Sequence, residues 1–379
     1  MTPPRVAIVT TEPTASRVPQ LDLLARRPDL DLTVFYAAET VQRRRWDLEI
    51  GHPHVVLSGP TIPTARVIHH DYPVTPSLWR RLDAGRFDVV VVWGWSTFAA
   101  QLAIVWARAH GVPFVLFSES HHSEPRRPAV RSVRDALLPR IVRPAAAWLV
   151  TGRLARDHLV HYGADPRRVF VFANTIDVDA LEHEIDEQRR DRDALRSELG
   201  VQPEEVVVLH AGRLLPIKGP DLLVEAAAGV PGLHVLVVGD GPLRGALADR
   251  AEQLGVKTTF LGFLDHDGLA RAYAAADVFA LLSRRETWGV VVNEAAAAGL
   301  PLVLADTVGA AADLLVPGEN GILVASGDVE ATRAALRTLT ADPSLRERYG
   351  ARSRALIAGW GYGPSADAFV AAVESALGS

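Results

Sequence analysis

The sequence predicts an α/β protein built from two doubly wound domains that face a central cleft. Short β-branched runs alternate with helix-length amphipathic stretches along most of the 379 residues, a rhythm typical of βαβ units and parallel sheets. The rhythm pauses once, at residues 178–200, and then starts again. Because single cores stop growing above about 250 residues, a chain of this length is expected to form two domains.

The first half contains six apolar runs that we expect to be buried strands. Between two of them, residues 97–110 form a helix-length stretch closed by Gly111 and Pro113, which are typical helix-ending residues. The six strands are predicted at residues 5–10, 32–37, 88–94, 113–118, 146–152 and 168–173.

The second half repeats the pattern after the charge-rich stretch 178–200, which we interpret as a solvated helix at the domain junction. Helices are expected at 220–228 and 242–254. Ligands of such sheets bind beyond the carboxyl ends of the strands, so the cleft between the halves is the default site. The five further strands are predicted at residues 205–212, 234–241, 258–263, 277–283 and 301–306.

The composition excludes several classes of protein. The net charge is −5 with no basic block, which argues against nucleic acid as a partner. The absence of cysteine excludes disulfides, thiolate catalysis and cysteine-ligated metals. No apolar run approaches the roughly 20 residues of a membrane span, and the first residues do not resemble a signal peptide, so a cytoplasmic location is expected. The basic helix at 126–143 could touch an anionic membrane, but packing on its own sheet is favoured.

Two cations follow the first strand of the second half. Arg213 and Lys218 lie in the loop after residues 205–212, and a helix begins near Pro220, whose fixed φ suits a first helical turn. A helix N-terminus with an arginine fork and a lysine suits a phosphate or diphosphate. A surface loop with two solvated cations is the alternative.

Two glutamates, Glu286 and Glu294, stand in the otherwise apolar and small-residue stretch 283–301. Residues 290–298 read as a helix ended by Gly299, with unpaired amides at its start. Eight helical residues rise about 12 Å, which is too far for a glycosidase carboxylate pair. The glutamates could instead hold the two ends of a sugar-nucleotide, with the hexose at Glu286 and the ribose at Glu294. The alternative is pairing with arginines such as Arg284 and Arg285.

The stretch 283–301 resembles the E-x7-E signature of the retaining glycosyltransferases of family 4. Residues 211–219 resemble that family's phosphate-binding Arg and Lys, and segments 237–243, 260–283 and 308–324 continue the similarity. Residues 172–181 resemble the motif that ends the family's first domain, and 359–369 resemble the start of its last helix. The similarity runs from about residue 145 to the end.

This resemblance implies a GT-B fold of two Rossmann-like domains, an acceptor domain at 1–180 and a donor domain at 181–360. The helix at 361–379 would pack on the first domain. It implies transfer with retention from a nucleotide-diphosphate sugar to a hydroxyl acceptor, with UDP favoured over GDP and no cofactor or essential metal. The donor residues so implied are Gly212, Arg213, Lys218, Gly262, Phe263, Leu264, Glu286, Thr287, Trp288, Gly289, Val290 and Glu294.

The first half departs from the family pattern. Residues 10–20 lack the usual glycine-rich turn. After the fourth strand the family often places a histidine near the sugar, and here direct spacing reaches Glu119, with His121 and His122 just beyond. We expect His121, or alternatively Glu119, to face the reacting centre together with the catalytic Glu286, Arg213 and Lys218. His121, His122 and Trp95 are the candidates for acceptor binding. The alternative for the loop residues is that they only shape the acceptor site or pair with Arg126 and Arg127, and the alternative for Trp95 is core packing.

Two other patterns carry less weight. The glycines of residues 237–245 miss the G-x-G-x-x-G spacing because Arg244 stands at one of its positions. DxD pairs occur at 177–179, 191–193 and 265–267, and we interpret each as solvated surface rather than a metal site.

The remaining functional alternatives are a sugar-nucleotide epimerase or hydrolase on the same fold and a non-catalytic sugar-nucleotide-binding protein.

Overall fold

The computed structural model describes residues 2–39, 49–61, 72–121 and 128–378. It divides into two compact units, Met1–Asn174 together with Tyr362–Ser379, and Thr175–Gly361. The division falls slightly before the boundary expected at residue 180, and the C-terminal helix is grouped with the first unit.

The first unit contains a parallel sheet of seven strands in the order β3-β2-β1-β4-β5-β6-β7. Six of these strands were predicted. The seventh, β3, has only three residues and pairs with β2 at the edge, which is why its pattern is weak. The strands are β1 (Arg5–Thr10), β2 (Asp31–Tyr36), β3 (His54–Val56), β4 (Val89–Trp93), β5 (Phe114–Ser118), β6 (Ala147–Val150) and β7 (Val169–Val171).

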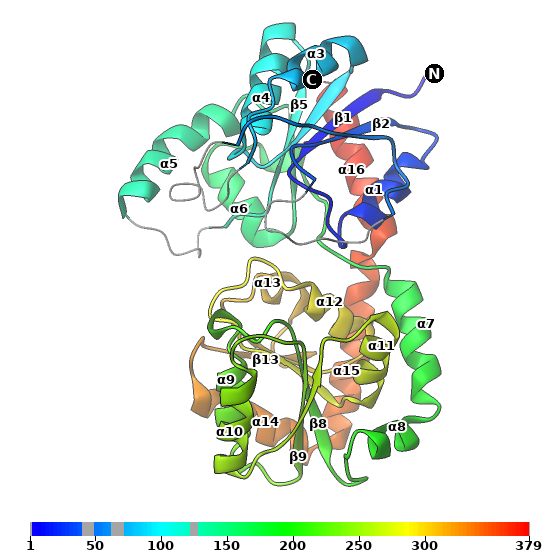
Figure 1. The fold of residues 1–379 in the computed structure, drawn as a ribbon, viewed down its shortest axis with the longest axis vertical. Helices are drawn as coiled ribbons and strands as arrows, with labels where there is room; N and C mark the ends of the chain where they lie inside the picture. Colours follow the sequence, from blue (N-terminus) through cyan, green and yellow to red (C-terminus); the bar gives the residue numbers. More distant parts are fainter. Residues whose placement is uncertain (1, 40–48, 62–71, 122–127, 379) are drawn as a thin grey trace. The chain divides into compact units, whose positions relative to one another are not determined.

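Helices cover both faces of this sheet, as the continuous apolar strands require. In β4, Val90 and Val92 pack in one buried cluster, whereas Val89 and Val91 pack in the cluster on the opposite face. The C-terminal helix α16 lies beside β6, β7 and α1 (Figure 1). The helices are α1 (Val18–Ala25), α3 (Ser77–Gly85), α4 (Phe98–His110), α5 (Pro128–Val142), α6 (Arg153–His161) and α16 (Tyr362–Leu377).

The second unit contains a parallel sheet of six strands in the order β10-β9-β8-β11-β12-β13. Five were predicted, and the additional strand β13 is a short edge strand. Two doubly wound sheets are therefore confirmed. The strands are β8 (Val206–Ala211), β9 (Leu233–Val238), β10 (Lys257–Gly262), β11 (Val278–Leu281), β12 (Leu302–Ala305) and β13 (Gly321–Val324).

The charge-rich stretch after the first unit is not the single solvated helix expected. It forms two helices, and Leu181, Ile185 and Leu195 from them are buried in the core of the second unit. The helices of this unit are α7 (Val178–Arg189), α8 (Arg192–Glu198), α9 (Pro220–Ala227), α10 (Arg244–Leu254), α11 (His266–Ala275), α12 (Val290–Ala297), α13 (Ala311–Leu314), α14 (Val329–Ala341) and α15 (Pro343–Ile357).

Candidate functional site

The loops that follow β8 and β11 in the second unit are joined directly. The Arg284 amide donates to the Ile217 carbonyl at 2.8 Å, and the Ser283 hydroxyl lies 3.4 Å from the Lys218 carbonyl. Gly219 makes this approach possible, because its φ is 65° and a β-carbon there would lie 2.2 Å from the Leu282 carbonyl oxygen. Only glycine fits such a position without displacing backbone.

The joined loops bring Lys218 and Glu286 together. The Lys218 Nζ donates to Glu286 Oε2, and the two side chains are 27% and 15% exposed. The structure therefore places two of the expected site residues in direct contact, as an ion pair. Chain-wide, lysine occurs only here and at Lys257, which also pairs with a glutamate, Glu205.

A third loop fixes the backbone of Glu286. The Glu286 amide donates to Thr307 O at 3.2 Å, and the Gly309 amide donates to Glu286 O at 2.9 Å. A β-carbon at Gly309 would lie 2.0 Å from Thr287 O, so this loop also depends on a glycine. The backbone of Glu286 is thus fixed on both sides by hydrogen bonds to the loop after β12.

Helix α12 begins at Val290, four residues after Glu286. Its N-cap, Gly289, has φ 96° and no side chain caps the first amides. A β-carbon at Gly289 would lie 3.2 Å from Glu286 Cγ, so the Glu286 side chain lies across the start of the helix. The helix ends before Gly299 with φ 66°, as predicted. Uncapped amides and the helix dipole favour an anion at this position.

Trp288 does not offer its side chain to this site. Its ring is buried, its Nε1 donates to Asn293 Oδ1 at 3.0 Å, and Asn293 donates onward to Thr175 Oγ1 at 3.2 Å. Among the residues predicted around the helix start, Trp288 can therefore contribute only through its backbone.

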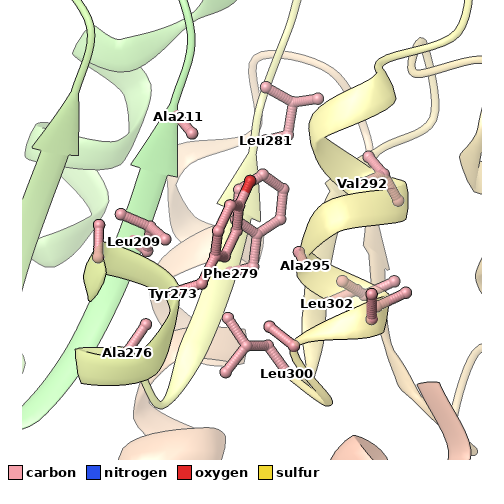
Figure 2. Close-up of a cluster of buried hydrophobic side chains, with 14 of the residues drawn as sticks. Leu209, Ala211, Tyr273, Ala276, Phe279, Leu281, Val292, Ala295, Leu300 and Leu302 are labelled. Atoms are coloured by element: carbon pink, nitrogen blue, oxygen red, sulfur yellow. The ribbon is translucent and has the colours of Figure 1, made fainter. Parts of the chain in front are cut away.

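Glu294 lies within α12 and is held by a residue that the sequence did not indicate. The Tyr273 hydroxyl donates to Glu294 Oε2 at 2.8 Å. Figure 2 shows the Tyr273 ring beside Phe279 in the core, with its hydroxyl oxygen at the end nearer Leu281. Burial raises the pKa of Glu294, although the Tyr273 hydrogen bond and the charge of His266 act to lower it. A lone tyrosine among the alanines of α11 was the only signal available.

Neither glutamate pairs with the arginines named as alternatives. Arg284 instead binds Asp221, with its Nη1 and Nη2 at 2.9 and 2.6 Å from the two carboxylate oxygens. The alternative in which Glu286 and Glu294 only neutralise neighbouring arginines is therefore wrong for Arg284.

Arg213 remains exposed in the loop after β8. Within the described part of the chain its guanidinium has no hydrogen bond or ion pair, in contrast to Lys218 and Arg284. Gly212 before it has φ 154°, and its amide donates to Val238 O at 3.0 Å. A planar cation with free donors is available on the same loop as Lys218.

The end of β10 carries Phe263, which is 87% exposed. Gly262 before it has φ 69°, and its carbonyl accepts from the Gly239 amide at 2.7 Å, so this turn is joined to the loop after β9. The half-buried Leu264 packs against the core of the unit. A ring so exposed has no packing role and is free to stack on a planar ligand.

The candidates of the first unit lie at the carboxyl ends of its strands. Glu119, after β5, accepts from Arg17 Nη2 at 2.8 Å, and Arg17 also donates to Ala173 O at 2.8 Å. The Arg17 guanidinium lies 5.0 to 5.4 Å from three aromatic ring centres, and burial lowers its pKa. This buried arginine stands in the segment where the expected glycine-rich turn is absent, and the sequence did not predict its role.

His121 is buried at 4% exposure, and Trp95 is half-buried against the core beside α4. Glu119 is 41% exposed at its side chain, so it is the more accessible of the two alternatives considered near the reacting centre. His122 lies outside the described residues.

The DxD pairs serve as helix starts. Asp177 and Asp265 cap α7 and α11 by accepting from Ala180 N and Gly268 N at 3.2 and 2.9 Å, and Asp191 precedes α8. Over the described ranges, no group of three His, Cys, Asp or Glu side chains is arranged to hold a metal ion. The helices described there also include none of the length and hydrophobicity needed to span a bilayer.

Comparison with known proteins defines the class. Residues 24–180 match Glycosyltransferase Family 4 and residues 191–356 match the group 1 glycosyl transferases. The fold is GT-B, with two Rossmann-like domains. The two matches together span most of the chain, so the chain belongs to the glycosyltransferases that combine a Family 4 domain with a group 1 domain.

Curated relatives include D-inositol 3-phosphate glycosyltransferases. The protein of Rhodococcus opacus is 39% identical over 203 residues, which cover 50% of this chain and 44% of the relative. That of Mycobacterium marinum is 31% identical over 285 residues, 71% of this chain and 58% of the relative. The chain thus spans about half the length of the curated relatives it matches.

Solved structures share the fold at low identity. HepE of Anabaena in complex with UDP has a TM-score of 0.75 and 20% identity, covering 98% of this chain and 100% of HepE. Sucrose-phosphate synthase of Thermosynechococcus elongatus has a TM-score of 0.71 and 19% identity, covering 98% of each chain. These similarities establish the architecture.

Proposed function

We propose that the protein is a retaining glycosyltransferase that moves a hexose from a nucleotide-diphosphate sugar to a hydroxyl of an acceptor. The observation that carries the proposal is the contact of Lys218 with Glu286 across the uncapped start of α12. A cation, an acid and free amides at one point match the three parts of such a donor: phosphate charge, sugar hydroxyls and the bond between them.

The diphosphate binds Lys218, Arg213 and the backbone amides from Thr287 to Val290, which lead into the start of α12. These fixed positive groups stabilise the charge that develops on the departing nucleotide, so no metal ion is needed. Glu286 accepts hydrogen bonds from sugar hydroxyls once Lys218 turns to the phosphate. In the transfer, the bond from the sugar C1 to the diphosphate oxygen breaks, the acceptor oxygen bonds to C1 on the same face, and the acceptor proton is released.

The nucleoside extends along the same edge of the sheet. Glu294 accepts from ribose hydroxyls, as carboxylates commonly do in nucleotide-binding α/β domains. Phe263 stacks on the base beside the Gly262–Leu264 backbone. HepE, which shares the fold, was solved with UDP and with UDP-glucose, and UDP-glucose is therefore the first donor to test.

The acceptor is an alcohol, and the curated relatives supply the first candidate. They are named as D-inositol 3-phosphate glycosyltransferases, so a phosphorylated cyclitol heads the acceptor screen. In the first unit, His121 and Trp95 are the described candidates for acceptor binding, and Glu119, oriented by Arg17, is the alternative to His121.

The test begins with thermal shift against nucleotide-sugars, because a ligand that binds the folded state raises the unfolding temperature. UDP release is then measured with and without D-inositol 3-phosphate or other polyols. We expect release that depends on acceptor and falls at least 100-fold in Glu286→Gln. Glu225→Gln, in an exposed ion pair with Arg250, is the matched control and should retain activity.

Other outcomes would replace the proposal. Release of UDP without any acceptor would identify a hydrolase, and a changed sugar still attached to the nucleotide would identify an epimerase. Nucleotide-sugar binding with no turnover against any acceptor would identify a binding protein. Inversion at C1 in the product, seen by NMR, would contradict retention.

A further inference from the structure

Arg244 is a cation in an unfavourable place. It is the first residue of α10, whose first turn contains no acid, and the helix dipole disfavours positive charge there. Its side chain is exposed, and among the residues that the structure describes it forms neither an ion pair nor a hydrogen bond. It is also the residue that breaks the G-x-G-x-x-G spacing of the loop after β9.

The position of this arginine is defined by its neighbours. A β-carbon built on Gly262 would lie 3.2 Å from Arg244 Nη1, so the guanidinium lies beside Gly262, the residue that precedes Phe263 in the chain. The Leu243 amide donates to Leu214 O at 3.2 Å, and the Leu214 amide donates to Asp240 O at 2.9 Å. These bonds join the Arg244 loop to the loop that carries Arg213.

The acid on the same loop does not neutralise Arg244. Asp240 Oδ1 instead accepts from the Gly241 amide at 2.7 Å. Gly239 and Gly241 allow this loop to approach the Arg213 loop closely, because β-carbons there would lie 2.0 Å from Gly212 O and 2.5 Å from Leu214 O. Across the described residues the Arg244 guanidinium therefore keeps its donors unused, beside Gly262 and on a loop that is hydrogen-bonded to the Arg213 loop.

We propose that Arg244 recognises the carbonyl edge of the donor nucleobase and selects uracil or guanine over adenine. This rests on the proposed function, which places the base at Phe263. A guanidinium has five donors and no acceptor, so it pairs with the carbonyl oxygens of uracil or with O6 and N7 of guanine. Adenine presents an amino donor where those bases present a carbonyl, and that group meets the Arg244 donors unfavourably.

The experiment compares ligands that contain the base with and without the phosphates. Affinities for UDP, uridine and ADP are measured by calorimetry or ligand-observed NMR on the wild type, Arg244→Ala and Arg244→Lys. Arg250→Ala, on the exposed face of the same helix, is the control for loss of a surface charge. Circular dichroism and the unfolding temperature verify that each variant folds.

We expect Arg244→Ala to lower the affinity for UDP and the affinity for uridine by the same factor, about tenfold. The affinity for ADP should change less than twofold. Arg244→Lys should lose most of the preference because it lacks the planar fork. Arg213→Ala should weaken UDP but leave uridine unchanged. Arg250→Ala should match the wild type for all three ligands.

Three results would overturn the inference while leaving the proposed function standing. If Arg244→Ala weakens UDP but not uridine, the arginine binds phosphate. If the substitution leaves the affinity for UDP unchanged, or lowers the affinity for ADP by the same factor, the arginine does not recognise the base. A wild type that binds no nucleoside diphosphate would remove both the inference and the function on which it rests.

Discussion

Lys218 and Glu286 are 68 positions apart in the sequence, and their side chains are bonded to each other in the second unit. In the assignment above, the lysine belongs to the diphosphate and the glutamate to the sugar. The nucleotide must therefore compete with Glu286 for the lysine, and the two residues have opposite effects on nucleotide affinity.

Glu286→Gln should increase the affinity for UDP two- to fivefold, because it removes a competing partly exposed ion pair worth about 0.2–1 kcal/mol. Lys218→Ala should decrease the affinity about 10- to 100-fold, the range for hydrogen bonds to charged groups. Calorimetry with UDP, which lacks the sugar, measures both effects. A Glu286→Gln variant that binds UDP as weakly as Lys218→Ala would refute the competition.

The native Glu294 side chain is expected to lower the stability of the folded protein at pH 7 and to strengthen UDP binding. Burial raises the pKa of Glu294, so its contribution to stability is complete below the unfolded pKa and declines as pH rises through the folded pKa. At pH 7, Glu294→Gln should therefore raise the unfolding temperature, by about 2–4 °C for each kcal/mol recovered.

The same Glu294→Gln variant should bind UDP about tenfold more weakly, since a carboxylate is a stronger acceptor for ribose hydroxyls than an amide. Thermal unfolding at pH 5 and pH 7 and calorimetry measure the two effects. Glu252→Gln, an exposed glutamate of α10, is the control and should change neither. An unfolding temperature that falls at pH 7 would contradict this account of Glu294.

Turnover should not depend on a divalent cation, because Lys218, Arg213 and the α12 amides supply the positive charge. We expect activity in EDTA to equal activity in buffer within twofold. Loss of activity in EDTA that magnesium or manganese restores would show that a metal takes part.

The buried Glu205, which directly precedes β8 in the second unit, should determine how the stability of the protein changes at acidic pH. Although burial acts to raise it, hydrogen bonds from Lys257, the Gln202 amide and His234 lower the pKa of Glu205 to about 2. The carboxylate therefore stabilises the fold above the unfolded pKa of about 4.5, and this contribution is lost as pH falls toward 2.

Glu205→Gln should consequently lower the free energy of unfolding at pH 7, by up to about 3 kcal/mol, and by progressively less below about pH 5. Urea unfolding at pH 7, 5 and 4 tests this, with Glu252→Gln as the control. A difference between wild type and Glu205→Gln that does not shrink on acidification would show that the charge of Glu205 is not responsible.

The sequence predicted most strands because both faces of each sheet are covered, which leaves continuous apolar runs such as residues 89–93. It missed β3 and β13, which are short edge strands with few buried residues. It also misjudged residues 178–200, where charged residues outnumber the few apolar side chains that attach α7 and α8 to the core.

By itself, the sequence determined the two doubly wound sheets, the helix start after Glu286, the glycine that ends α12 and the residues Arg213, Lys218, Glu286 and Glu294 as candidates. Those features depend on local propensity, periodicity and motif spacing. The tertiary structure decided which polar side chains are paired: Lys218 with Glu286, Arg284 with Asp221, Tyr273 with Glu294 and Arg17 with Glu119. In the part of the chain that the structure describes, Arg213 and Arg244 have no such partner. Such pairs form between loops and helices remote in the chain, and their energy depends on distance and burial that exist only once the sheets have assembled.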